Sequence, residues 1–489
     1  MTSDTTAPSS PPIDARERIA LCVITAVAIA CRLVALWQPM RYDESITWAY
    51  FVGRSWTTVI SAYQFPNNHV LHSLLAKLAV SVVPWAPWAL RLPAFLAGVA
   101  IVPLTWLVGR RFADRGTALF GAALTAVSTT LVLYSTNARG YSFVVMLFLV
   151  MLLVADRIRR RTARHGWPVL ALLGALGLYT IPVMLYPMGV VLLWLVLDAR
   201  NLPAKERARR IACAALSGAG ALVLAGVLYL PIIRSSGLSA LIGNKFVRAS
   251  PWIQFAFDLP KFFAETLGTW SSPLPWWCAF VLPVLALLGL RRLSPSRAPS
   301  LALATIAWCA TLLLVTHHVP FVRVWLFMLP LFLLAVGRGA IHVWRDTVGH
   351  RRPAWTLDAA LVATAVVVSI GAEALGARPA LASDDTGVFR PAREVAAILA
   401  PRLQPGDRVL APIPSNGPLL YYFAERGLDT ASLTVPLAKS RRAYLVLDQS
   451  QGQDLTWAVR IGMIDPAQFR EPELVGRSGT AEVWATERR

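Results

Sequence analysis

The chain has 489 residues, of which 56% are hydrophobic and only 15% charged. This apolar share exceeds that of an ordinary soluble domain and excludes a protein that lies wholly in water. A formal charge of +20 would suit nucleic-acid binding only if the basic residues formed one face, but they lie between apolar runs. We therefore expect a polytopic membrane protein without a nucleic-acid partner.

The apolar runs predict an α-helical membrane protein whose hydrophilic residues 1–18 form a cytoplasmic tail. A bilayer span needs about 20 predominantly apolar residues, and the run from Ile19 onward predicts an uncleaved signal anchor. On this basis we expect a transmembrane domain over residues 19–377 with about eleven transmembrane helices. They are expected at 19–39, 89–109, 116–134, 141–155, 167–180, 182–197, 211–231, 276–290, 299–316, 324–337 and 356–376.

Arginine gathers in every second gap between the expected spans. Such loops stay in the cytoplasm under the positive-inside rule. This places the N-terminus in the cytoplasm and two long loops, 40–88 and 232–275, outside a cell membrane (bacterial inner or plasma membrane). Within the first of these loops, residues 69–83 predict an amphipathic surface helix. The arginine groups are Arg110, Arg111 and Arg115, then 157–164, 200–210, 291–297 and 338–352.

Residues 378–489 have a different pattern, which predicts a small soluble α/β domain outside the membrane. Helices are expected within 391–403 and 418–427, and strands within 405–413, 441–449 and 482–487. This stretch contains no Gly-rich phosphate loop and no Cys/His metal set. We therefore expect a structural or substrate-gating module.

Two adjacent carboxylates, Asp43 and Glu44, open the first outer loop directly after Tyr42. Partial desolvation at a membrane surface would raise a carboxyl pKa toward the range of a general base. The alternative is a solvated pair, or a helix N-terminus that Asp43 caps. The residues alone leave both interpretations open.

His69 and His72 lie one helical turn apart in the same loop and so on one helix face. Such a pair could donate hydrogen bonds to a phosphate or ligate a metal. Two histidines without a carboxylate at metal spacing favour hydrogen bonding. Neither residue is expected to hold a metal.

Two arginines lie at the outer ends of expected spans, where the charge rule does not favour them. Arg139 ends the third span, and Arg323 follows His318 in a late outer loop. An arginine there either extends to lipid headgroups or pairs with an anion. A guanidinium group suits phosphate because it stays charged and binds in a bidentate manner.

Together these motifs resemble the GT-C superfamily of membrane glycosyltransferases, in particular the branch similar to protein O-mannosyltransferases and the lipid A aminoarabinose transferase. The resemblance implies a GT-C-like fold and a glycosyltransferase. Its donor would be a polyprenyl-phosphate-linked monosaccharide within the membrane lipid, and its acceptor a lipid, a glycan or a protein at the outer face. The motifs are Tyr42-Asp43-Glu44, 68–75, Trp88 to Pro93, Ala138 to Tyr141, and Pro320 to Arg323.

The resemblance also implies roles for single residues. Asp43 would be the catalytic base with Glu44 in support, and transfer by a single displacement would invert the anomeric carbon. Val70, and Val324 with Trp325, depart from the pattern of relatives. The donor phosphate would be bound by Arg323, His69 and Arg139, and further substrate contacts are expected from Tyr42, His72, Tyr141 and His318.

No metal or other cofactor is predicted. A divalent cation held by Asp43 and Glu44 is an alternative, but the sequence offers few convergent ligands. Three rival functions remain. A transporter or flippase predicts ionisable residues within spans, and Arg32 is the only obvious one. A non-catalytic scaffold would tolerate Asp43→Asn, and an oligosaccharide ligase or polymerase would lack the early Asp-Glu loop.

Overall fold

The structure is a computed structural model that describes residues 13–163, 165–243, 249–291, 298–347, 364, 371–434, 436–437 and 440–489. The chain divides into two compact units. One, the helical unit, comprises Met1–Leu36, Ile60–His72 and Arg91–Ala382. The other, the sheet unit, comprises Trp37–Val59, Ser73–Leu90 and Ser383–Arg489. The sheet unit therefore takes in much of the first expected outer loop together with the C-terminal residues.

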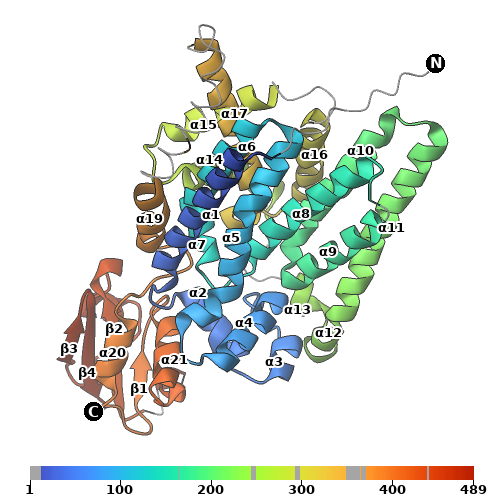
Figure 1. The fold of residues 1–489 in the computed structure, drawn as a ribbon. Helices are drawn as coiled ribbons and strands as arrows, with labels where there is room; N and C mark the ends of the chain where they lie inside the picture. Colours follow the sequence, from blue (N-terminus) through green and yellow to red (C-terminus); the bar gives the residue numbers. More distant parts are fainter. Residues whose placement is uncertain are drawn as a thin grey trace, which may run out of the picture. The chain divides into compact units, whose positions relative to one another are not determined.

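The helical unit consists of apolar helices joined by short connections (Figure 1). Backbone polar groups within a bilayer must be satisfied inside the segment, which is why these runs are helical. The main helices are α1 (Ala15–Leu36), α5 (Pro87–Phe112, from Arg91 onward), α6 (Arg115–Val127), α7 (Thr129–Ser135), α8 (Tyr141–Arg159), α9 (Gly166–Thr180), α10 (Leu185–Asp198), α11 (Ala204–Leu228), α14 (Trp252–Ser271), α15 (Cys278–Arg291), α16 (Ala298–Thr316) and α17 (Leu329–Thr347). Shorter pieces are η2 (Pro182–Met184), η3 (Ala199–Asn201), α12 (Leu230–Ser236), α13 (Leu238–Ile242), η4 (Val322–Met328), η6 (Ala372–Ala377) and α19 (Arg378–Ala382).

Six helices among the described residues are long and apolar enough to cross a membrane, or seven if the bent pair α6 and α7 forms one span. Other expected spans form the shorter apolar helices α9, α15 and α16. The expected span 356–376 lies mostly outside the described residues. The expected outer loop 232–275 holds the 20-residue helix α14. A multi-spanning helical protein is confirmed, and the number eleven stays a prediction.

Helix α8 lies at the centre of the largest apolar core and is buried along most of its length. Phe148 packs against Phe327 of η4 with ring centroids 5.1 Å apart. Helices α15 and α17 meet at glycines: a Cβ on Gly289 would lie 2.1 Å from the Ala335 carbonyl oxygen, and one on Gly339 1.9 Å from that of Leu285. Small residues of this kind allow helices in a membrane to pack backbone to backbone.

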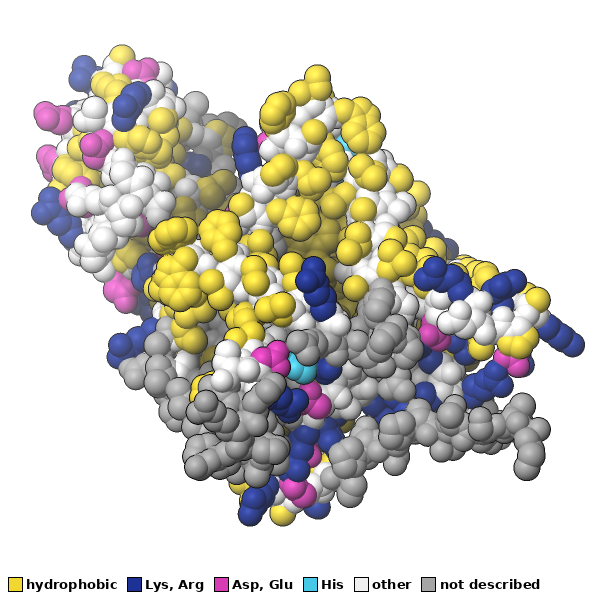
Figure 2. Space-filling model, turned by 90° about the horizontal axis from the view of Figure 1, so that it is seen from above, with side chains coloured by type: hydrophobic (Ala, Val, Ile, Leu, Met, Phe, Trp, Pro, Cys, Tyr) yellow, Lys and Arg dark blue, Asp and Glu magenta, His cyan; other side chains and the backbone are white. Residues whose placement is uncertain are grey.

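Acidic residues beside the predicted arginine-rich loops form ion pairs with arginines of those loops. Glu17 is fully buried at the start of α1. Its carboxylate lies 3.3 Å from both Arg110 and Arg115 and accepts a hydrogen bond from Trp106 Nε1 at 3.1 Å. Figure 2 shows broad hydrophobic areas on one face and Lys and Arg side chains in groups with Asp and Glu. Part of the excess positive charge is therefore neutralised by ion pairs with acidic residues.

Helices α6 and α7 bend by 59° at a break of one residue, Ser128. The break leaves carbonyl groups near the end of α6 without a helical donor. Arg32 of α1 is fully buried and donates from Nη1 to the carbonyl oxygens of Ala28 and Ala126, at 3.1 Å each. Nη1 of this arginine therefore has a structural role at the break, whereas Nε and Nη2 are buried and bond to no group in the described part of the chain.

The sheet unit contains a four-stranded sheet of order β1-β2-β4-β3, in which β1 and β2 are parallel and the other pairs antiparallel. The helices and strands predicted within 391–449 and 482–487 are all present, whereas β3 was not predicted. The elements are α2 (Tyr42–Thr47), η1 (Trp48–Val52), α3 (Trp56–Ser61, to Val59), α4 (Val70–Val82, from Ser73), α20 (Ala392–Leu399), β1 (Arg408–Leu410), α21 (Asn416–Glu425), η7 (Thr430–Leu433), β2 (Arg442–Asp448), η9 (Gln449–Gln451), α22 (Leu455–Arg460), β3 (Glu473–Ser478) and β4 (Ala481–Glu487).

Strand β2 is the centre of this sheet and is buried from Ala443 to Asp448. It lies between β1 and β4, and its continuous apolar run is typical of a strand covered on both faces. On one face, Leu445 and Leu447 pack with Phe469 and Ala458 of the following segment. The sheet is thus a separate small core with its own hydrophobic cluster.

Candidate active site

Two arginines and a tyrosine meet in the helical unit. Arg323 of η4 donates from Nε to the hydroxyl oxygen of Tyr141, the first residue of α8, at 3.0 Å. The guanidinium carbons of Arg323 and Arg139 lie 6.0 and 5.8 Å from the centroid of the Tyr141 ring. Three residues from separate sequence motifs are therefore brought together. We call Arg139, Tyr141, Arg323 and His69 the cation cluster.

His69 belongs to this cluster because its side chain accepts a hydrogen bond from the backbone of Gly140. Its Nδ1 accepts a hydrogen bond from the Gly140 N–H at 2.6 Å, and its ring packs edge-on against Tyr141 at 5.3 Å. Since Nδ1 accepts, Nε2 carries the proton of the neutral ring. Nε2 is buried and donates to no acceptor within the described part of the chain. It is a hydrogen-bond donor held in a fixed direction.

The electrostatic surroundings of His69 are positive. Burial chiefly, and then Arg139, His72 and Arg323, hold the pKa of His69 well below its usual value of 6.5. Two of these neighbours, Arg139 and Arg323, are cations, whereas burial lowers the pKa of His72 to about 3 and keeps it neutral. A pair of positive charges of this kind favours an anion as its partner.

His72 and His318 lie outside the hydrogen bonds of the cation cluster. His72 is buried and packs edge-on against Phe143, with ring centroids 6.1 Å apart. His318 is half-buried between α16 and η4, where its backbone N–H donates to Thr316 Oγ1 at 3.4 Å. Substrate contacts by these two histidines stay predictions.

Tyr63 and Gly140 were not identified from the sequence. Burial raises the pKa of Tyr63 to about 12, and Tyr141 and Arg139 also act on its hydroxyl group, so it lies close to the cation cluster. A Cβ on Gly140 would lie 2.4 Å from Thr180 Cγ2 and 3.1 Å from the His69 Cβ. A single tyrosine in a loop carries no signal of its own, but the glycine between Arg139 and Tyr141 could have suggested close packing.

In the sheet unit, the two adjacent carboxylates have different surroundings. Glu44 is fully buried, and its Oε1 accepts the backbone N–H of Arg41 at 2.9 Å, which closes the first turn of α2. Asp43 is only half-buried. The geometry therefore gives Glu44 a structural role in this helix and leaves Asp43 as the carboxylate closer to solvent.

The backbone of the Asp43 segment is held by residues 383–388. Nη1 of Arg41 donates to the carbonyl oxygens of Ser383 and Asp385, at 2.8 Å each. The N–H of Tyr42 donates to Gly387 O at 2.9 Å, and that of Asp43 to Thr386 O at 3.2 Å. Residues more than 340 positions apart thus form one backbone interface. The sequence contains no motif that indicated it.

Tyr42 packs between two glycines of the same unit. A Cβ on Gly387 would lie 2.7 Å from the Tyr42 Cβ, and one on Gly417 2.6 Å from its ring. Gly387 also has a φ of +74°, which other residues adopt with strain. Burial and then the charge of Asp43 raise the pKa of the Tyr42 hydroxyl group. Tyr42 is therefore a packing residue here, and its contact with substrate stays a prediction.

No group of three or more His, Cys, Asp or Glu side chains that could hold a metal ion occurs within the described residues. Oε1 of Glu44 already accepts the Arg41 N–H. The part of the chain that the structure describes therefore adds no ligand to the Asp43 and Glu44 pair that the sequence analysis considered for a divalent cation.

Comparison with known proteins gives matches in sequence and in structure. Residues 68–229 match the family described as Dolichyl-phosphate-mannose-protein mannosyltransferase. Apo ArnT from Cupriavidus metallidurans superposes with a TM-score of 0.63 at 14% identity, over 96% of this chain and 98% of that chain. The chain has a GT-C membrane glycosyltransferase fold.

Two further structures support the GT-C fold. ArnT from the same organism, bound to undecaprenyl phosphate, gives a TM-score of 0.51 at 16% identity, over 96% of this chain and 98% of that chain. The archaeal oligosaccharyltransferase AglB from Archaeoglobus fulgidus, in complex with an inhibitory peptide and a dolichol-phosphate, gives 0.51 at 11% identity, over 90% and 70%. No curated protein sequence matches the chain. The resemblance to GT-C proteins predicted from the motifs is confirmed at the level of fold.

Proposed function

We propose that this GT-C protein transfers a monosaccharide from a polyprenyl-phosphate donor to an acceptor at the outer face of a cell membrane. The observation that carries the proposal is the cation cluster, in which Arg139 and Arg323 both approach Tyr141 and His69 presents a fixed donor. Two proteins of the same fold are recorded with undecaprenyl phosphate or a dolichol-phosphate. A polyprenyl phosphate is the anion that this cluster would bind.

In the proposed reaction the cation cluster binds the donor phosphate. The guanidinium groups of Arg139 and Arg323 oppose the charge that develops on the leaving phosphate oxygen, and His69 donates from Nε2. Tyr141 orients Arg323 through its hydroxyl group. Such preplaced donors stabilise the transition state because they need no rearrangement during the reaction.

Asp43 is proposed as the general base. It takes the proton of the acceptor hydroxyl group as that oxygen attacks the anomeric carbon. The bond from this carbon to the phosphate oxygen breaks, and its electron pair stays on the phosphate. One displacement of this kind inverts the configuration. Glu44 supports the base indirectly, because it holds the first turn of α2.

The proposed orientation places residues 1–18 in the cytoplasm and the α/β domain expected over residues 378–489 outside. The arginine-rich loops support this arrangement under the positive-inside rule. A donor already in the bilayer suits a reaction at the outer face, since no nucleotide sugar is supplied there.

The deciding experiment measures transfer of radiolabelled sugar from membrane polyprenyl-phosphate donors to endogenous acceptors. Wild type is compared with Asp43→Asn at equal expression, with Asp429→Asn, an exposed cap that asparagine preserves, as the matched control. We expect transfer by wild type and by Asp429→Asn, and its loss in Asp43→Asn. Normal transfer by Asp43→Asn would reject the base, and no transfer across a panel of such donors would reject the function.

A further inference from the structure

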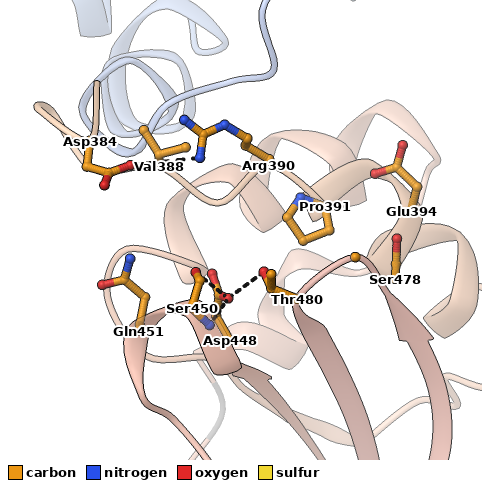
Figure 3. Close-up of a pocket in the computed structure, with 11 residues that line it drawn as sticks. Asp384, Val388, Arg390, Pro391, Glu394, Asp448, Ser450, Gln451, Ser478 and Thr480 are labelled. Atoms are coloured by element: carbon orange, nitrogen blue, oxygen red, sulfur yellow. Dashed lines mark hydrogen bonds and ion pairs between the residues drawn. The ribbon is translucent and has the colours of Figure 1, made fainter. Parts of the chain in front are cut away.

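The sheet unit contains a pocket of about 540 Å³ that the proposed chemistry does not use (Figure 3). Its volume is in the range of small-molecule sites. Three segments line it: 384–394, the end of β2 with η9, and the turn between β3 and β4. The lining residues are Asp384, Val388, Arg390, Pro391, Glu394, Asp448, Ser450, Gln451, Ser478, Gly479 and Thr480.

Asp448 is a preorganised carboxylate in this pocket. It is only 3% exposed, and its Oδ1 accepts hydrogen bonds from Ser450 N at 3.0 Å, Ser450 Oγ at 2.7 Å and Thr480 Oγ1 at 2.7 Å. Figure 3 shows these bonds between the end of β2 and the neighbouring turn. All three donors bind Oδ1, and Oδ2 receives no hydrogen bond within the described part of the chain. The second oxygen is therefore an acceptor in a fixed position.

The charges of the pocket restrict its ligand. Asp384, Glu394 and Asp448 oppose an anion, Arg390 pairs with Asp384 at 3.8 Å, and the described residues include no group of three acids, histidines or cysteines that could hold a metal ion. Only Val388 and Pro391 are apolar, so an acyl chain would find little surface. Sugar hydroxyl groups donate to carboxylates and accept from guanidinium and amide groups. A neutral polyhydroxylated ligand can therefore donate hydrogen bonds to the carboxylates of the pocket and accept them from Arg390.

One wall of the pocket is also the segment that holds the proposed base. Asp384 and Val388 line the pocket, and the carbonyl groups of Thr386 and Gly387 between them accept the N–H groups of Asp43 and Tyr42. Arg41 forms a backbone bridge with Val388. A ligand that orders residues 384–388 would therefore also order the backbone of Asp43.

We infer that this pocket binds a neutral sugar unit of the acceptor, which makes the acceptor a glycan or a glycan-bearing molecule. The inference rests on the proposed glycosyltransferase function, which supplies the acceptor. Asp448 and Glu394 accept hydrogen bonds from the sugar, and Arg390 donates to it. The segment 384–388 connects occupancy of the pocket to the position of Asp43.

The first test measures binding alone. Saturation-transfer NMR is recorded on the full chain in nanodiscs free of glycoside detergents, with methyl α-D-mannopyranoside, methyl β-D-galactopyranoside and N-acetylglucosamine as probes. We expect saturation transfer to at least one probe, reduced at least fivefold in the double variant Glu394→Gln/Arg390→Met. Glu471→Gln, an exposed acid outside the pocket, should leave the signal unchanged. Both altered side chains are exposed, so folding should be retained.

The second test separates acceptor from donor and the pocket from the proposed function. In the transfer assay, the double variant should raise the KM for acceptor about tenfold and leave the KM for donor unchanged. A changed donor KM would place the donor sugar in the pocket and overturn the inference. If wild type transfers sugar and the double variant behaves in the same way, the inference about the pocket is rejected and the proposed function is retained. Probe binding that depends on the pocket, without any transfer, would reject the proposed function and leave only a sugar site.

Discussion

The two units hold their candidate site residues in different ways. In the helical unit, His69, Arg139 and Arg323 come from distant parts of the chain and meet through side chains around one ring. In the sheet unit, Asp43 and Glu44 are neighbours whose positions depend on one helical turn and on backbone hydrogen bonds. Substitutions in the cation cluster should therefore change ligand binding. Substitutions at Asp43 and Glu44 should distinguish a residue needed for catalysis from one needed for stability.

The largest effect is expected from substitutions of the two adjacent carboxylates, Asp43 and Glu44. Asp43→Asn should lower the rate of transfer by about 10²–10⁴-fold, the usual contribution of a general base, with an unchanged melting temperature. Glu44→Ala should instead destabilise the protein by about 1 kcal/mol because the cap is lost, and Glu44→Gln should restore stability. Thermal unfolding and transfer assays on the three variants check this. Equal loss of activity in Asp43→Asn and Glu44→Gln would contradict the division of roles.

The next effect concerns the planar fork of Arg323. Arg323→Lys keeps the charge but loses the Nε hydrogen bond to Tyr141 and bidentate binding of phosphate. We expect the KM for the polyprenyl-phosphate donor to rise about tenfold, measured by initial rates against donor concentration. Arg234→Lys, at an exposed arginine of α12, is the matched control. An unchanged donor KM in Arg323→Lys would remove Arg323 from the phosphate site.

A steric pair can test how closely the cation cluster is packed. Gly140→Ala places a Cβ 2.4 Å from Thr180 Cγ2, and overpacking of this kind costs about 1–3 kcal/mol. Thr180→Ser removes that methyl group and should restore most of the lost stability in the double variant. Thermal unfolding of the two single variants and the double variant measures the coupling. Additive effects would show that the residues do not meet.

Tyr141→Phe should have a smaller effect, because the ring remains beside both arginines. It removes the acceptor of the Arg323 Nε hydrogen bond, which is worth about 1 kcal/mol, or about fivefold in donor affinity. Equilibrium binding of a short-chain polyprenyl phosphate measures it. Tyr186→Phe, at another half-buried tyrosine of the same unit, serves as control. An effect as large as that of Arg323→Lys would mean that the hydroxyl group contacts the ligand itself.

The smallest effect is expected from the titration of His69. Because its pKa lies well below 6.5 in the fold, His69 stays neutral, and its titration should not appear in the pH profile of transfer between pH 5.5 and 8. The unfolded chain takes up a proton near pH 6.5 and the folded protein does not, so stability is full above that pH and falls below it. His69→Gln should reduce this dependence in unfolding measurements from pH 7.5 to 5, and His72, whose pKa burial lowers to about 3, accounts for a remaining slope of the same sign. An unchanged slope would show that His69 is protonated in the fold.

Most of the main helices and strands β1, β2 and β4 could be predicted from the sequence because each depends on a local pattern. Long apolar runs predicted the helices, and a short continuous apolar run predicted β2. Strand β3 was missed because half of its residues are exposed and none is buried, and because its pairing with β4 shifts register between Leu474 and Gly476. Such a strand has neither alternation nor a continuous apolar run.

The residues of the candidate site were chosen from motifs, but their arrangement could not be predicted. A hydrogen bond from Arg323 to Tyr141 joins positions 182 residues apart. The interface between Arg41 and residues 383–388 consists of backbone carbonyl groups, which every residue has, so no side-chain signature marks it. The different surroundings of Asp43 and Glu44 likewise depend on which carboxylate reaches the Arg41 N–H.

The bond from Arg32 to Ala126 has a consequence for biosynthesis. Its acceptor lies 94 residues downstream, so α1 enters the bilayer during translation before that carbonyl group has been made. A central arginine costs about 2.5–3.5 kcal/mol on insertion, and the nascent helix offers it only the carbonyl group of Ala28. The final depth of α1 in the bilayer should therefore depend on the later insertion of α6. This makes the two helices an early unit of assembly in the membrane.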